Sequence, residues 1–196
     1  MATTQAQKLD QLKGYRDYAR FADEQTDPRH EKIVRVMMEH YKWEVLGQPD
    51  GVMKTLVPDP HYRFYGLRSS FELRGLAEVR PFYEELATSG ANVLQLDMEY
   101  LLVNDTCLAG SGVWHQVYRG ETVMAEGGLV SSDQITDPDG RYLLSQAMGW
   151  FMPFNSDEEP LMLGELVYLH SEPLSVRKLA EGEEVFEPVT QADFAL

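Results

Sequence analysis

The chain of 196 residues carries 32 acidic and 17 basic side chains, and its formal net charge at pH 7 is −15. This balance excludes nucleic acids and anionic membranes as main partners, because both bind through a basic patch. Hydrophobic residues make up 43% of the chain, enough for a substantial core, yet no apolar run reaches the roughly 18 residues of a membrane span. The N-terminus lacks a secretory signal pattern and the single cysteine, Cys107, cannot form an internal disulfide, so we expect a cytoplasmic protein.

The first 28 residues are mostly polar and show only a thin helical stripe of apolar side chains. Asp27-Pro28 ends this segment, since the residue before a proline is disfavoured in a helix. We therefore predict an N-terminal helical extension over 1–28 that the core does not need for folding. Apolar periodicity continues over 29–178, which predicts one domain, and 179–196 are predicted to form an acidic C-terminal tail.

Helical spacing predicts a long helix over 28–46, a short one over 50–57 with Asp50 as its N-cap, and a third over 75–88 that Gly90 ends. Alternating segments rich in β-branched and aromatic residues predict strands over 61–65, 93–103, 106–119, 122–131, 142–154 and 161–170. Helices followed by consecutive hairpins are typical of an α+β fold, in which the helices cover one face of a mostly antiparallel sheet.

Three segments resemble the nuclear-transport-factor-2-like superfamily, and within it the SnoaL-like polyketide cyclases, ketosteroid isomerases and scytalone dehydratases. PDGVMKTLVPDPHYRF is similar to the passage from the short helix into the first strand of these proteins. LRGLAEVRPFYEEL resembles their third helix, and PFNSDEEPLMLGELVYL resembles their closing hairpin. The resemblance covers about residues 30–170.

This resemblance implies a cone-shaped, cystatin-like fold, in which a curved, mostly antiparallel sheet wraps around about three helices and encloses an apolar pocket. Members of the superfamily use this pocket as an enzyme site, a binding site or part of a dimer. The fold alone therefore does not decide the activity, and the candidate side chains have to do so.

The long helix over 28–46 carries two ionisable residues, His40 and Glu44, inside its apolar arc. They are four residues apart, so their side chains are neighbours on one helix face. We predict an acid/base pair at the pocket wall, with Glu44 orienting and charging His40. The alternative is a buried pair that only fixes the position of the helix.

The strand over 106–119 offers His115. Its neighbours Trp114 and Gln116 point to the opposite face of the strand, so either the histidine or the glutamine is turned inward. His115 is a candidate hydrogen-bond donor or base, although a strand histidine is often exposed or satisfied by structural contacts.

Four further polar residues lie in predicted strands: Tyr65, Asp97, Glu165 and Tyr168. Tyr65 is a candidate donor to a ligand oxygen, a role that tyrosines have in the related isomerases and dehydratases. Asp97 and Glu165 are either inward-facing acids or solvated positions, and Glu165 and Tyr168 point to opposite faces. These three residues are candidate ligand contacts.

The methionines and aromatic residues favour core packing, and they also suit an adaptable apolar pocket. We take Tyr41, Trp114 and Trp150 as candidate substrate-binding residues. The chain has no glycine-rich phosphate loop and no Gly-x-Ser-x-Gly elbow, and its five histidines are scattered. We therefore expect no cofactor and no metal.

These features together predict a cofactor-independent lyase, isomerase or cyclase that acts on a small apolar carbonyl or hydroxyl compound. His40 with Glu44 is the predicted base, and Tyr65 or His115 is the predicted donor to the developing oxyanion. A non-catalytic binding or dimerisation module of the same fold is the alternative. A homodimer is expected, because a curved open sheet leaves a broad surface uncovered.

Overall fold

The computed structural model describes residues 8–66, 70–124 and 134–195. Its helices are α1 (Lys13–Asp23), α2 (Pro28–Val45), α3 (Pro49–Met53), α4 (Leu76–Ser89), α5 (Gly120–Met124) and a 3-10 turn, η1 (Gln191–Phe194). Its strands are β1 (His61–Tyr65), β2 (Phe71–Arg74), β3 (Leu94–Asn104), β4 (Cys107–Arg119), β5 (Arg141–Pro153), β6 (Leu166–Leu169) and β7 (Ser175–Lys178).

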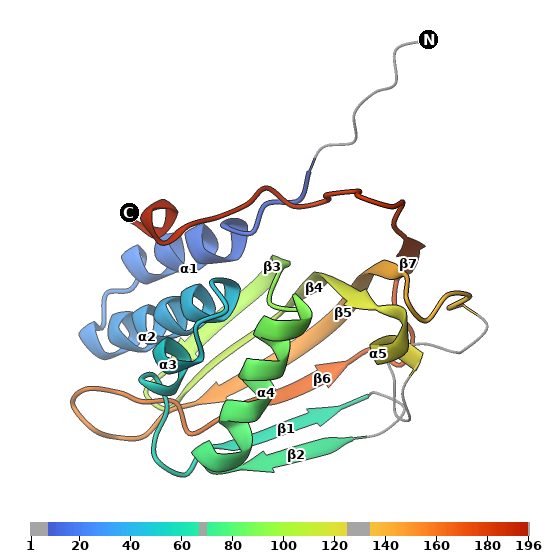
Figure 1. Ribbon diagram of the computed structural model, residues 1–196. Coiled ribbons are helices and arrows are strands. Elements are labelled where there is room, and N and C mark those ends of the chain that lie inside the picture. The colour runs from blue at the N-terminus through green and yellow to red at the C-terminus, as the bar shows by residue number, and fades with distance from the viewer. Residues whose placement is uncertain (1–7, 67–69, 125–133, 196) are drawn as a thin grey trace.

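The strands form one sheet in the order β2-β1-β6-β5-β4-β3, and β7 pairs with β5 beside β6. All neighbours are antiparallel except β1 and β6, which run parallel. The helices α1, α2 and α4 lie on one side of this curved sheet (Figure 1). The predicted α+β architecture, a mostly antiparallel sheet with helices on one face, is therefore confirmed.

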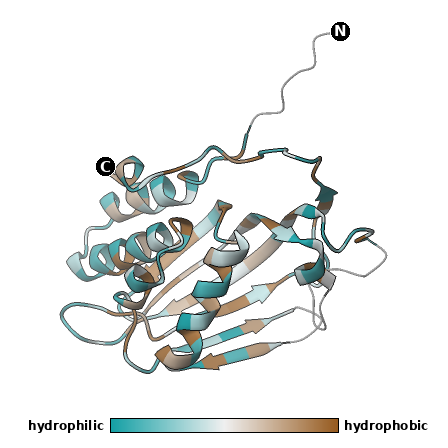
Figure 2. Cartoon of the chain, viewed as in Figure 1, coloured by the Kyte–Doolittle hydropathy of each residue, from teal (hydrophilic) through white to brown (hydrophobic). Residues whose placement is uncertain are grey.

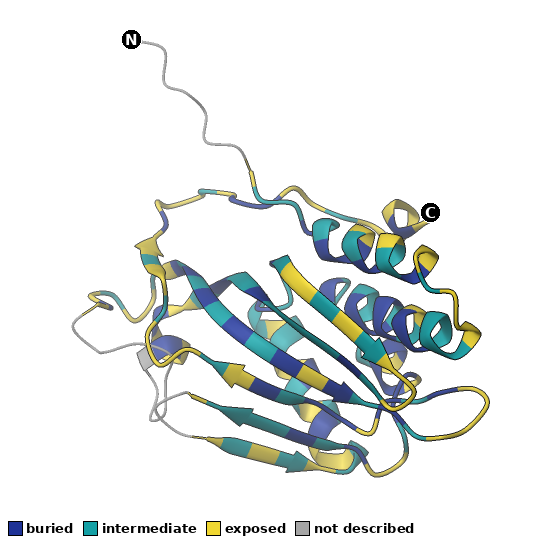
Figure 3. Cartoon of the chain, turned by 180° about the vertical axis from the view of Figure 1, so that it is seen from behind, coloured by how far each residue is buried: buried dark blue, intermediate teal, exposed yellow. Residues whose placement is uncertain are grey.

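The two faces of the sheet differ because successive side chains of a strand point to opposite sides. Along β5, buried positions alternate with partly exposed ones. Hydropathy alternates along the strands in the same way (Figure 2), and the view from behind shows the strands without helices in front of them (Figure 3). We call the side that faces the helices the covered face and the other side the open face. The covered face of the two longest strands consists of Trp114, Gln116, Tyr118, Leu144, Gln146, Met148, Trp150 and Met152.

Helix α2 begins where the sequence predicts. The side chain of Asp27 accepts a hydrogen bond of 2.8 Å from the backbone N–H of Arg29, and Pro28 occupies the first turn. This is a favourable helix start, because the cap satisfies a free N–H group and proline has none to satisfy. Helix α4 ends at Gly90, which has a φ of 77° in the left-handed region that glycine adopts without strain.

The N-terminal segment is packed differently from the expectation of a separable extension. Tyr15, Tyr18 and Ala22 of α1 are buried in the same core as α2 and the sheet. The predicted acidic tail also contributes to the interior, since Phe194 packs edge-on against Tyr15 at 4.9 Å between ring centroids. Figure 1 shows the C-terminal segment running back across the molecule to lie beside α1. Neither end of the described chain stands apart from the core.

Three predicted elements differ from the structure. The short helix starts at Pro49, so Asp50 lies inside it and Gln48 occupies the cap position. Residues 120–124 are helical where a strand over 122–131 was predicted, and the remainder of that strand lies outside the described residues. The strand predicted over 161–170 is shortened to β6, because Gly164 has a φ of 130° and its backbone lies against His61. The short strands β2 and β7 were not predicted.

Candidate active site

A cavity of about 500 Å³ lies between the covered face and the helices α2 and α4. Most of its wall is apolar and includes nine aromatic residues: Tyr18, Tyr41, Phe64, Phe71, Phe82, Tyr83, Trp114, Tyr118 and Trp150. Polar groups reach it from several elements: Glu44, Glu85, Ser89, Gln116, Thr122, Gln146 and Glu165. This combination of a concave apolar wall with a few polar groups is typical of a small-molecule site.

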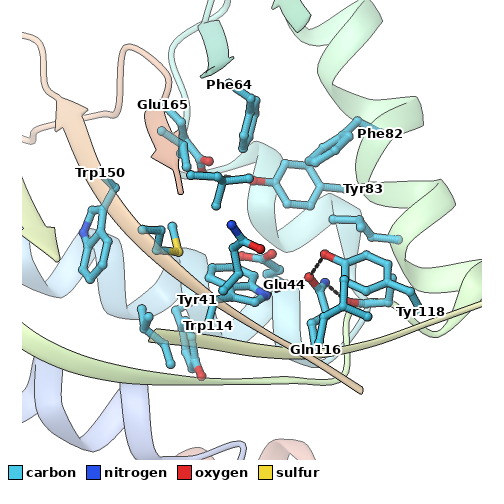
Figure 4. Close-up of a pocket in the computed structure, with 18 of the residues that line it drawn as sticks. Tyr41, Glu44, Phe64, Phe82, Tyr83, Trp114, Gln116, Tyr118, Trp150 and Glu165 are labelled. Carbon is cyan, nitrogen blue, oxygen red and sulfur yellow. Dashed lines mark hydrogen bonds between the residues drawn. The ribbon is translucent and has the colours of Figure 1, made fainter. Parts of the chain in front are cut away.

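Glu165 is a polar group of the cavity whose position is fixed by neighbouring side chains. It is the residue immediately before β6, and its side chain points into the cavity (Figure 4). Its Oε1 accepts a hydrogen bond of 3.2 Å from the Tyr83 hydroxyl and lies 3.1 Å from Nε2 of His40. Tyr62 extends the cluster, with 3.2 Å between its hydroxyl and that of Tyr83. A buried carboxylate needs such partners, because water does not solvate it.

His40 lies behind Glu165 and is fully buried. Its Nδ1 is 2.8 Å from Oγ1 of Thr55, whose hydroxyl donates a 2.6 Å hydrogen bond to the carbonyl of Val52. Because that hydroxyl proton is committed, the Thr55 oxygen accepts and Nδ1 carries a hydrogen. Nε2 is then the nitrogen that faces Tyr83, at 2.9 Å, and Glu165. His40 therefore connects the turn after α3 to the carboxyl group of Glu165.

Glu44 enters the same cavity from α2 (Figure 4). Burial, and secondly the negative charge of Glu165, raise the pKa of the Glu44 carboxyl to about 8. Among the residues that the structure describes, none forms a hydrogen bond or ion pair with this carboxyl group. Glu44 is therefore a neutral acid at pH 7 whose proton is available to a molecule in the cavity.

The aromatic wall is fixed by its own hydrogen bonds. Gln116 accepts a 2.7 Å hydrogen bond from Nε1 of Trp114 and a second one from the hydroxyl of Tyr118, while its amide donates to the carbonyl of Ala91 (Figure 4). Burial raises the pKa of the Tyr83 hydroxyl well above its usual value, and the charge of Glu165 adds to this effect. The tyrosines of the wall are therefore neutral donors.

The structure brings five of the sequence-predicted residues to the cavity wall: Tyr41, Glu44, Trp114, Trp150 and Glu165. It also corrects the predicted pair. Both ring nitrogens of His40 are occupied by Thr55, Tyr83 and Glu165, so the carboxyl group beside His40 belongs to Glu165 rather than to Glu44. His40 itself does not line the cavity.

The other four predicted residues lie on the open face, outside the cavity lining. His115 contacts Ser145 at 2.9 Å and Asp97 at 3.1 Å, and Asp97 also pairs with Lys13 at 3.4 Å. The rings of Tyr65 and Tyr168 pack on each other at 5.4 Å. Strand alternation places them there, because their neighbours in sequence point to the helices. The placement of Tyr65, Asp97, His115 and Tyr168 at the pocket was wrong.

Sequence reasoning missed Tyr83, Thr55 and Gln146. Tyr83 was counted among the apolar positions of its helix, where a tyrosine hydroxyl is not distinguished from a ring that only packs. Thr55 lies in the turn after α3, which shows no pattern of its own. Gln146 interrupts an apolar set of alternate residues in its strand, from Tyr142 to Met152, and this interruption was the one available signal.

Among the described residues, one trio has ligand atoms close enough to share a metal ion: Asp27, His30 and Asp105. Asp27 already caps α2, and His30 lies 3.0 Å from Asp105 at the surface. These residues are not part of the cavity lining. Within the described ranges, no helix is long and apolar enough to cross a membrane.

No protein-family model matches this sequence, and no curated protein is similar to it in sequence. Solved structures are similar in fold. A protein assigned to the SnoaL-like polyketide cyclases from Jannaschia sp. CCS1 superposes with a TM-score of 0.52 at 11% identity, over 74% of this chain and 90% of that one. Another so assigned, from Shewanella denitrificans OS-217, gives 0.52 at 10% identity, over 69% and 88%. An NTF2-like protein of unknown function from Burkholderia xenovorans LB400 gives 0.50 at 11%, over 76% and 90%.

These likenesses show that the chain has the NTF2-like fold of the SnoaL-like proteins, as the sequence resemblance predicts. At such low identity they show the fold alone, so the chemistry of the cavity has to be argued from its own side chains.

Proposed function

We propose that this chain is a cofactor-independent enzyme, a lyase, isomerase or cyclase, that moves a proton on a small apolar carbonyl or hydroxyl compound. One observation carries the proposal: two carboxyl groups with different surroundings point into a single apolar cavity. Glu165 contacts His40 and Tyr83, whereas burial raises the pKa of the Glu44 carboxyl to about 8. Such a difference is how an active site supplies a base and an acid at the same pH.

In the proposed reaction, Glu165 is the base. Its carboxylate takes a proton from a carbon next to the substrate carbonyl, and the electrons of the C–H bond move to the carbonyl oxygen. Glu44 donates its proton to that oxygen and so stabilises the developing negative charge. His40 and Tyr83 do not meet the reacting carbon; they hold Glu165 in place. In the isomerase outcome the enol is conjugated with a C=C bond, takes the proton from Glu165 at the far carbon of that bond and returns its hydroxyl proton to Glu44. In the cyclase outcome the enol carbon attacks a second carbonyl, whose oxygen takes the proton from Glu165, and the enol hydroxyl proton returns to Glu44.

Two further features support this class of substrate. The aromatic wall matches an apolar ring system, and the cavity of about 500 Å³ accommodates a compound of two or three fused rings. The structures from Jannaschia and Shewanella, which are assigned as polyketide cyclases, share the fold, although a common fold supports the class less strongly than the two carboxyl groups do.

The test is exchange of the C–H protons next to the carbonyl of tetralone, a bicyclic aromatic ketone, in deuterated buffer followed by NMR. The wild-type chain is expected to accelerate this exchange above the buffer rate. Glu165→Gln keeps the shape of the side chain without the base and is expected to lower the accelerated rate at least about 100-fold.

His115→Gln is the matched control, because it changes an ionisable residue on the open face and is expected to leave the rate within about twofold. A wild-type chain that binds tetralone without accelerating exchange favours the non-catalytic binding module instead. Equal rates for Glu165→Gln and the wild type contradict the assignment of the base.

A further inference from the structure

Two glutamines lie on the covered face, and their hydrogen bonds differ. In Gln116, Oε1 accepts from Trp114 and Tyr118, and the amide donates to Ala91. Its oxygen is therefore engaged in holding the wall of the cavity and is not a free acceptor for a ligand.

Gln146 is only half satisfied. Its Nε2 donates to the backbone carbonyl of His170, and a carbonyl oxygen can only accept. This contact fixes the orientation of the amide, so Oε1 is the end without a partner. Among the described residues, Oε1 of Gln146 has no hydrogen-bond partner although the residue is only 6% exposed. A buried acceptor without a partner destabilises the folded chain, and a ligand that supplies a donor would remove this cost.

The position of Gln146 shows where a partner would come from. On β5 it lies between Leu144 and Met148 of the same face, and in the sheet it is directly opposite Trp114. All three neighbours line the cavity, as does Gln146 itself. These three side chains offer no free donor at this position, so the oxygen is open to a donor on a molecule inside the cavity.

We infer that Gln146 selects ligands that carry a hydroxyl group, so that the substrate is a hydroxylated apolar carbonyl compound. The surroundings favour a neutral O–H over a charged ammonium group, because the neighbours Leu144, Met148 and Trp114 would not solvate a full charge. This inference rests on the proposed function only in that the cavity is the substrate site. It adds a specificity residue that takes no part in the proton transfer between substrate, Glu165 and Glu44.

The experiment compares three ligands of one ring system: hydroxytetralone, its methyl ether, and unsubstituted tetralone. Their dissociation constants are measured by titration calorimetry. The wild-type chain is expected to bind hydroxytetralone at least about tenfold more tightly than either of the other two, because only this ligand donates a hydrogen bond to the buried acceptor. Gln146→Leu removes the acceptor at similar volume and is expected to bring the three constants to within about twofold of one another.

Met148→Leu is the matched control, since it changes the next residue of the same face without a polar group and is expected to keep the tenfold preference. Circular dichroism and the thermal unfolding curve of Gln146→Leu establish that the variant is folded. If Gln146→Leu fails to fold, Gln146→Met provides a longer apolar side chain for the same comparison.

Three outcomes overturn the inference. A wild-type chain that binds the three ligands equally shows that water or another group satisfies Gln146. A preference that persists in the folded Gln146 variant assigns the selection to another residue. A lowered pKa of Glu44 in that variant, with no change in ligand preference, makes Gln146 the partner of the Glu44 proton.

The proposed function fails separately from this inference. Selective binding of hydroxytetralone without any exchange activity contradicts the enzyme and leaves the role of Gln146 intact. Exchange activity without selective binding supports the enzyme and contradicts the role of Gln146. Absence of binding for all three ligands overturns both.

Discussion

The covered and open faces of β4 and β5 are built from alternate residues of the same two segments, yet they differ in chemistry. Beside the covered face, Glu44 and Glu165 reach one cavity, where burial, and secondly the charge of Glu165, raise the pKa of Glu44. On the open face, His115 and Asp97 form a comparable pair at 3.1 Å, but the side chain of Asp97 is 40% exposed. Solvent screens such exposed charges, so the interaction between them is weak. Ionisable side chains are therefore candidates for catalysis only where they line the cavity.

The largest expected effect tests how far the covered face depends on α1. Tyr18 is 1% exposed and packs edge-on against Tyr41. Tyr18→Ala leaves a cavity in the core and is expected to lower the free energy of unfolding by about 3–5 kcal/mol, measured by denaturant titration in dilute solution. Tyr100→Ala removes the same side chain from the open face, where it is 72% exposed, and is expected to cost less than about 0.5 kcal/mol.

A small effect of Tyr18→Ala, equal to that of Tyr100→Ala, would restore the expectation that residues 1–28 are a dispensable extension. The structure argues against that outcome, because Tyr15 and Ala22 are buried beside Tyr18.

The next effect concerns pH. The pKa of Glu44 is raised from its ordinary 4.5 to about 8 in the folded chain. Between these values the folded state keeps a proton that the unfolded state has lost, so the free energy of unfolding falls as the pH rises. The contribution of Glu44 is fully present below pH 4.5 and is lost as the pH passes about 8, with a slope of at most about 1.4 kcal/mol per pH unit.

Glu44→Gln is expected to flatten this slope, because the amide does not titrate. The variant should therefore gain stability relative to the wild type as the pH rises to 8. Glu99→Gln, an exposed position on β3, serves as the control and should follow the wild-type curve. Parallel curves for Glu44→Gln and the wild type would show that Glu44 is ionised and solvated.

The architecture was largely predictable, because it depends on periodicities that the sequence displays. Strand β1 was predicted with its observed bounds, and the starts and ends of α2, α4, β3, β4 and β5 were predicted to within one residue. The short strands β2 and β7 were missed, since four residues are too few for a period to appear. The shortened β6 depends on contact between Gly164 and a residue a hundred positions away, which no local pattern contains.

The site was less predictable, because it depends on which elements meet. The wheel of α2 correctly turned both His40 and Glu44 away from solvent, but their spacing suggested a pair that the structure does not form. The true partners of His40 come from three other elements, namely Thr55, Tyr83 and Glu165. For the strands, alternation divides residues into two sets but does not say which set is covered, so His115 and Gln116 were equally eligible.

The last prediction concerns assembly, for which the smallest change in the stability of the fold is expected. It addresses a second difference between the two faces. The open face carries large apolar side chains at high exposure: Tyr100 and Leu102 at 72%, Tyr168 at 49% and Phe151 at 46%. The register aligns Tyr100 with Tyr168 across Ser111 and Gly149, so two small residues lie between these rings. A broad apolar surface of this kind is self-complementary about a twofold axis and is typical of an interface rather than of a solvated face.

We therefore expect a homodimer through the open face, detected by light scattering at micromolar concentration. Leu102→Asp together with Phe151→Asp places charges in that surface and is expected to give a monomer whose unfolding in dilute solution changes by less than about 1 kcal/mol. Leu174→Asp is the matched control: Leu174 is 59% exposed but lies outside the strands, so the dimer should persist. A wild-type monomer, or a dimer that survives the double substitution, would leave the open face without a partner. The cavity would be unaffected, because the cavity side chains of these strands point to the opposite side of the sheet.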